Sequence, residues 1–184
     1  MGLFGNLFQT VNDLESQTQI LKQRAYGIIE IRDQEFHSVR LRPFPKLITR
    51  TQVRRAEARL ENQAASNDSD RVLLFYNQPM FHDKFLALKY LYSTSGCSLP
   101  SIAVSLSVLD YIARIKKTDA IVTEISNDKI QDRHLAHFGW QRHCPDSSRR
   151  HWIKRFYGRY PNRFLFQTAA ERSAAPAARE PALV

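Results

Sequence analysis

Hydrophobic residues follow two different periods along the second half of the chain. Short apolar runs bounded by polar residues are typical of buried strands, whereas apolar residues spaced three and four apart are typical of a helix that covers a sheet. The clearest helix carries an apolar stripe made of Leu99, Ile102, Leu106, Leu109 and Ala113. Ser98 can cap the start of this helix, and Pro100 suits its first turn. The predicted elements are strands at 71–78, 83–93, 120–126 and 150–158 and helices at 99–117 and 128–138, the second helix ended by Gly139.

The order of these elements predicts the fold class. Helices between strands imply crossover connections and a partly parallel sheet covered by helices. The upstream elements indicated by the pattern are a helix within 10–27, short strands at 27–33 and 36–44, and an arginine-rich helix with a polar loop over 50–70. We therefore expect an α/β fold in which residues 1–166 form one domain with a mixed central sheet and flanking helices. The Ala/Pro-rich tail over 167–184 is expected to be disordered.

Composition narrows the choice of environment and partner. The 184 residues carry a formal net charge of +9, which favours an anionic partner such as nucleic acid, a phosphorylated ligand or a lipid surface. The two cysteines are too few for a disulfide framework, and no secretion signal is seen. The longest uncharged run, 90–109, has the length of a membrane span, but its serines, Gly96 and Pro100 make it too polar to insert readily. We expect a soluble, cytoplasmic protein with no membrane partner.

Three histidines and a cysteine gather near the end of the 128–138 helix. His134 and His137 lie three residues apart, and together with His143 and Cys144 they could offer zinc four nitrogen and sulfur ligands. However, adjacent His-Cys is an unusual ligand pair, and neither CxxC nor HExxH spacing occurs. We interpret these side chains as surface and turn residues and predict no metal site.

The segment 93–101 joins a predicted strand to the start of the 99–117 helix. Free backbone N–H groups at a helix N-terminus, together with the positive end of the helix dipole, suit a phosphate. The candidate ligand-binding residues in this segment are Ser95, Gly96, Cys97 and Ser98. With a single glycine, the backbone is less free to approach a pyrophosphate than it is in a glycine-rich loop.

A basic aromatic segment follows near the C-terminus. Arg149, Arg150, Lys154 and Arg155 are interleaved with large aromatic residues, and such a mixture can neutralise phosphates and stack the bases of a nucleic acid. In a strand, however, the aromatic residues can face the core while Lys154 and the arginines face water. Both interpretations stay open.

The second half of the chain resembles the C-terminal half of the GNAT acyltransferase superfamily, over roughly residues 70–158. The shared pattern is an apolar strand ending in Asn, a helix ending in Gly-aromatic, and an antiparallel closing strand. The matching positions are Asn127, Ile130, Gly139 and Trp140, with 150–157 as the closing strand. The resemblance implies that the start of the 99–117 helix and Asn127 bind acyl-CoA. The family's glycine-rich pyrophosphate loop is absent, and its general-acid tyrosine aligns with Leu135 or His134.

The same resemblance implies an N-acyltransferase that uses acetyl-CoA or another acyl-CoA and an amine-bearing acceptor. The amine must lose a proton, and the CoA thiolate must gain one. Glu124 stands in an apolar strand, where burial would disfavour its charge and make it a better base, and His134 could supply the acid. Glu124 could equally pair with a nearby arginine. If the site is present, strands 85–93 and 120–126 should part beside the start of the 99–117 helix.

Two other functional classes remain open. The net charge and the basic aromatic segment indicate a non-catalytic nucleic-acid-binding domain on the same fold. The missing glycine-rich loop indicates a partner-binding scaffold in which the catalytic loop has decayed.

Overall fold

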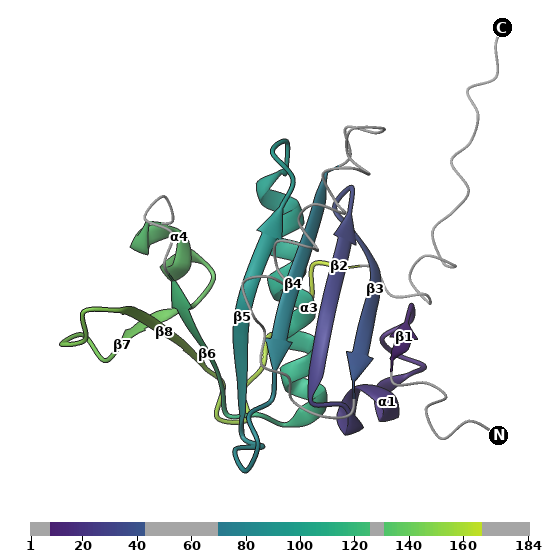
Figure 1. Ribbon diagram of the computed structural model, residues 1–184, viewed down its shortest axis with the longest axis horizontal. Helices are drawn as coiled ribbons and strands as arrows, with labels where there is room; N and C mark the ends of the chain where they lie inside the picture. Colours follow the sequence, from purple (N-terminus) through teal and green to yellow (C-terminus); the bar gives the residue numbers. More distant parts are fainter. Residues whose placement is uncertain (1–7, 43–69, 126–130, 167–184) are drawn as a thin grey trace, which may run out of the picture.

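One mixed sheet runs through the part of the chain that the structure describes, which comprises residues 8–42, 70–125 and 131–166. The elements of this computed structural model are β1 (Gln9–Val11), α1 (Thr18–Gln23), β2 (Tyr26–Arg32), β3 (Glu35–Arg42), β4 (Arg71–Asn77), β5 (Phe85–Ser93), α3 (Leu99–Lys116), β6 (Ala120–Ile125), α4 (Asp132–His137), β7 (Gln141–His143) and β8 (Arg150–Arg155). The strands lie in the order β1-β3-β2-β4-β5-β6-β8-β7 (Figure 1). β5 and β6 pair in parallel, and the other described neighbours are antiparallel. The predicted class, α/β with a mixed central sheet and flanking helices, is confirmed.

The N-terminal elements differ in part from those expected. The helix predicted within 10–27 is wrong at its start, because Gln9–Val11 pairs with β3 as a strand, and only α1 remains helical. The two short strands expected next form the antiparallel hairpin β2–β3. The arginine-rich helix and polar loop predicted over 50–70 lie outside the described residues apart from Asp70, and so does the tail 167–184.

The C-terminal half follows the predicted order. The strand predicted at 83–93 is confirmed as β5, and α3 crosses over between the parallel strands β5 and β6. β7 was not predicted, because three residues with no alternation of polarity carry little signal. The uncharged run 90–109 divides into the end of β5, a loop and the first half of α3. Among the described helices, none is long and apolar enough to cross a membrane.

Helix α3 covers the face of the sheet that carries the main hydrophobic core. The Ser98 side chain accepts a hydrogen bond from the Ser101 backbone N at 3.3 Å, and Pro100 lies in the first turn, so the predicted start is confirmed. The apolar stripe begins later than expected. Leu99 is 63% exposed, whereas Leu109 and Ala113 are fully buried.

The segment after β8 runs back along α3 and closes the core. The Tyr160 hydroxyl donates to the Thr118 carbonyl at 2.9 Å. Further along, Phe164 and Phe166 make edge-on contacts with Tyr111 of α3, with ring centroids 5.1 and 5.3 Å apart. Phe166 also reaches Phe36 of β3 at 6.4 Å, so the chain up to residue 166 packs on the sheet domain.

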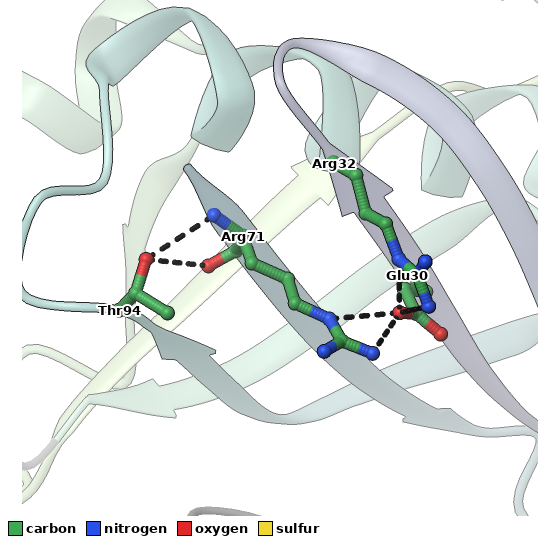
Figure 2. A network of polar contacts seen from close by, with 4 residues as sticks. All are labelled: Glu30, Arg32, Arg71 and Thr94. Carbon is green, nitrogen blue, oxygen red and sulfur yellow. Dashed lines mark hydrogen bonds and ion pairs between the residues drawn. The ribbon is translucent and has the colours of Figure 1, made fainter. Parts of the chain in front are cut away.

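A buried carboxylate, that of Glu30, holds β2 and β4 together (Figure 2). It alternates along β2 with Ile29 and Ile31, which pack in the core with α3, so it lies on the opposite face of the sheet. Glu30 is 5% exposed, and its Oε1 accepts from Arg32 Nε and Arg71 Nε, both at 2.8 Å. Burial alone would raise the pKa of Glu30, but the two arginines lower it overall. Thr94, which follows β5, accepts a hydrogen bond from the backbone N of Arg71 and donates one to its carbonyl oxygen. The network therefore fixes the start of β4, where the neighbouring Asp70 meets α3.

Candidate functional site

The parallel strands β5 and β6 part where the resemblance predicted an opening. They pair from Phe85 and Ala120 as far as Leu88 and Thr123, and β5 then continues to Ser93 without β6 beside it. At the last paired position, the Thr123 hydroxyl of β6 donates a hydrogen bond to the Leu88 carbonyl of β5 at 3.0 Å. Figure 1 shows the two strands diverging above this point. Beyond Leu88, β5 pairs with β4 on one side and with no described strand on the other.

A β-bulge in β5 lies at the same point. Phe75 of β4 pairs with Tyr90, and Tyr76 pairs with Leu88, so Lys89 is an extra residue with no opposite partner in β4. A bulge bends its strand and increases the local twist. We infer that this bulge helps to turn the upper half of β5 away from β6.

A cavity of about 350 Å3 lies between the parted strands. Its walls come from both parted strands, from the first half of α3 and from α4. The lining residues are Leu88, Lys89, Tyr90, Leu91, Leu99, Ile102, Leu106, Thr123, Glu124, Ile125, His134, Leu135, Phe138 and Trp140. A mostly apolar cleft with a few polar groups is typical of a small-molecule site.

The end of helix α4 is built to close one side of this cavity. Gly139 has φ +80° and donates its backbone N–H to Ala136 O at 2.9 Å, while Trp140 N donates to Leu135 O at 3.1 Å. This pair of bonds is the Schellman motif that often ends helices at glycine. The predicted stop at Gly139 is confirmed, and the motif holds Leu135 and Trp140 together on the cavity wall.

The structure brings the two predicted catalytic residues to one cavity, although not in the environment expected for Glu124. The Glu124 side chain is 46% exposed, so the prediction that it is buried is wrong. Its carboxylate lies 3.5 Å from Arg149 Nη1, which was the alternative left open from the sequence. His134, on α4, is exposed and also lines the cavity.

At the end of the predicted phosphate loop, the side chain of Asp70 already caps the N-terminus of α3. Ser95 and Gly96 are exposed, but the Asp70 carboxylate accepts from Ser98 N at 3.1 Å and from the Ser101 hydroxyl at 2.7 Å, and it also bonds the Ser98 hydroxyl. Burial alone would raise the pKa of Asp70, but these hydrogen bonds lower it overall. A negative charge therefore already lies at the N-terminus of α3.

Cys97 has no features of a nucleophile. Its thiol is half-buried beside Asp70, and burial together with this carboxylate raises the pKa of Cys97 to about 12. A thiol is nucleophilic only as the thiolate.

Sequence reasoning missed Asp70, because it precedes a strand and lies 28 residues from Ser98 along the chain. Only the pairing of strands brings the two together.

Replacing Asp70 with asparagine is expected to raise the affinity for free coenzyme A by about tenfold, because it removes a carboxylate from the helix start where the GNAT resemblance implies that the pyrophosphate binds. Stability should fall by about 1–2 kcal/mol, since the hydrogen bonds from α3 lose their charged acceptor. Titration calorimetry and urea unfolding measure the two effects separately. Asp83→Asn, with the same charge change at an exposed turn, should alter neither quantity; equal CoA affinity in both variants would contradict the prediction.

The same variant should change the acid side of the stability profile. Because the pKa of Asp70 is lowered in the fold, its contribution is complete above about pH 4 and is lost as the pH falls through the lowered value. Asp70→Asn should show less acid destabilisation than the native chain.

The remaining sequence candidates are the GNAT-matching residues after β6 and the candidate metal ligands. Asn127 and Ile130 belong to the undescribed segment 126–130. Within the described ranges, no group of three or more His, Cys, Asp or Glu side chains is placed to hold a metal ion. His137, one of the histidines considered, packs against Phe138 with ring centroids 5.4 Å apart.

The basic residues proposed to bind nucleic acid have other partners. Lys154 Nζ lies 2.6 Å from the Asp110 carboxylate of α3, with its side chain 16% exposed, so the interpretation in which Lys154 faces water is wrong. Arg149 pairs with Glu124, and Arg150 pairs with Asp132 at 2.7 Å. Arg155 donates to the Gln141 side chain at 3.0 Å. These contacts do not support a phosphate-binding surface along β8.

No protein-family model matches the sequence, and no curated protein matches it. Among solved structures, the chain is similar to the crystal structure of nourseothricin acetyltransferase, with 6% sequence identity and a TM-score of 0.37. The similarity covers 82% of this chain and 99% of that one. A TM-score this low does not establish a family or an activity, so any function proposed for the cavity depends on its own residues.

Proposed function

We propose that the protein binds an acyl-CoA in the cleft between β5 and β6 and transfers the acyl group to an amine. The observation that carries this proposal is the parting of two parallel strands over an apolar cavity that Glu124 and His134 both line. Each feature alone is common in α/β proteins. Their coincidence beside the start of α3 is what the resemblance to the GNAT superfamily implied.

The residues fit one part of acyl-CoA better than the other. The apolar walls suit the acyl chain and the pantetheine arm. The edge of β5 that faces away from β4, past the last pair with β6, suits the amide groups of pantetheine. The pyrophosphate fits less well, because Asp70 already caps α3. We therefore expect weak binding of coenzyme A to the native chain.

The proposed chemistry needs one residue of this chain to accept a proton and another to donate one. A thioester supplies an activated acyl group, and Glu124 takes the proton that the attacking amine loses. Because Glu124 is half exposed, it can return this proton to water, and the acceptor can approach from the solvent side. His134, across the cavity on α4, donates a proton to the departing thiolate.

Replacing His134 with alanine is expected to lower acyl transfer by about a hundredfold or more, and Glu124→Gln should act similarly, because positioned acid–base groups contribute effects of this size. Release of free thiol from acetyl-CoA and longer acyl-CoAs, measured with a panel of amines, checks the result. His137→Ala is the matched control, since His137 lies on the same helix but does not line the cavity. Absence of acyl-CoA binding at millimolar concentration, by calorimetry, would remove the proposal.

A further inference from the structure

Exposed apolar side chains gather at the end of the sheet opposite the cleft. The turn between β4 and β5 carries Met80, 59% exposed, and Phe81, 93% exposed. Phe85 begins β5 at 37% exposure, and Tyr157, just past β8, is 71% exposed. Single exposed apolar residues are normal, but a contiguous group indicates an interaction site.

Backbone hydrogen bonds bring these two segments to one edge. Asp119 N donates to Lys84 O at 2.7 Å, and Asp119 O accepts from Phe156 N at 2.7 Å and from Tyr157 N at 3.4 Å. Asp119 therefore joins the start of β5, next to the β4–β5 turn, to the residues that follow β8. Figure 1 shows the β4–β5 turn and the start of β6 at the same end of the molecule.

The backbone holds two of these rings in an uncommon conformation. Phe81 has φ +64° and Tyr157 has φ +45°, a region that bulky residues seldom adopt. The turn around Phe81 is fixed by His82 N bonding to Pro79 O at 3.2 Å and by Phe85 N bonding to His82 O at 3.0 Å. Such strain is often retained where a side chain must be presented for function.

The charge around the rings is mainly positive. The exposed basic residues at this edge are Lys84, Lys117 and Arg159, together with Arg155, which also donates to Gln141. Against them, the described acidic residues are Asp83, which is exposed, and Asp119, which is half-buried. This excess of positive charge complements an anionic surface.

We propose that this edge docks on an anionic lipid bilayer, with Met80 and Phe81 inserted among the headgroups and Tyr157 at the interface. This differs from the sequence-based expectation of no membrane partner, which considered only spanning segments. Apolar side chains at the tip of a turn, surrounded by lysine and arginine, match the pattern of peripheral membrane binding. Nucleic acid is the less favoured partner, because base stacking uses aromatic faces and gives no role to Met80. The cleft lies toward the other end of β5, so docking leaves it open to solvent.

Vesicle co-sedimentation of the full chain tests the proposal. The protein should bind vesicles of phosphatidylcholine mixed with phosphatidylserine, bind pure phosphatidylcholine much more weakly, and lose binding as salt rises. Met80→Ser with Phe81→Ser should weaken binding by about tenfold or more, since two apolar side chains lose their burial. Phe81→Gly is a second variant, which removes the ring and relieves the positive φ, so it should keep its fold by thermal unfolding.

Leu165→Ser is the matched control, because Leu165 is 63% exposed, close to the 59% of Met80, but lies against the middle of α3. It should bind vesicles like the native chain. Lys84→Glu with Arg159→Glu should weaken binding to the anionic vesicles only. The proposal is overturned if the native chain ignores anionic vesicles, or if Phe81→Gly binds them equally well. It is also overturned if the Phe81 variants instead lose binding to a single-stranded oligonucleotide or lose self-association in sedimentation velocity.

Discussion

Asp110→Ala is expected to destabilise the protein by about 3–5 kcal/mol, because it leaves the Lys154 ammonium buried without its partner. The two side chains are only 9% and 16% exposed and join α3 to β8 through a 2.6 Å contact. Burial raises the pKa of Asp110, although the Lys154 charge acts to lower it. The free energy of unfolding in urea measures the loss.

The matched experiment removes both charges together. Asp110→Leu with Lys154→Met keeps similar volumes and leaves no charge behind, so this double variant should be close to the native chain in stability. Arg150→Met is a useful comparison, since its partner Asp132 is 59% exposed and the loss should be below about 1 kcal/mol. The interpretation is wrong if the Asp110→Ala loss matches that of Arg150→Met.

Lys154 also shows what the sequence could and could not predict. Trp152, Lys154 and Phe156 share one parity in a strand, so Lys154 had to face the core with the two aromatic residues or break the alternation. Trp152 and Phe156 lie in the core that packs α3, and Lys154 bonds Asp110 of the same helix, so all three point to the same side. Lys154 can face the core because Asp110 of α3 neutralises its charge. Asp110 is 44 residues away along the chain, so the local sequence pattern around Lys154 does not predict this pair.

The fold was predictable where burial repeats along the chain, and the site was predictable only in outline. The α3 stripe, its Ser98 cap and the Gly139 stop depend on neighbouring residues, so they could be recognised locally. The exposure of Glu124 and the capping by Asp70 depend on how strands end and part in space, which periodicity does not encode. The cleft itself was expected only through the family resemblance.

The packing of Gly27 against Tyr76 is a further contact that periodicity does not reveal, and it leads to a second large effect. The two residues are directly opposite in the β2–β4 ladder, and Tyr76 is fully buried. A Cβ atom at Gly27 would lie 2.3 Å from Cε1, 2.4 Å from Cζ and 2.5 Å from the oxygen of the tyrosine. Gly27→Ala should therefore destabilise the fold by about 3 kcal/mol or more, because a buried ring has no room to move.

Changes at Tyr76 separate this steric effect from others. Tyr76→Phe alone should keep or raise stability by about 1 kcal/mol, because the buried hydroxyl has no hydrogen-bond partner among the described residues. It should not rescue Gly27→Ala, since the ring carbons stay in place. Tyr76→Leu removes those carbons, so the two substitutions together should cost less than the sum of the single losses. Gly158→Ala, with φ +79° and no atom within 4 Å, controls for backbone strain and should cost about 1–2 kcal/mol. Strict additivity of Gly27→Ala and Tyr76→Leu would show that the ring is not what excludes a side chain at position 27.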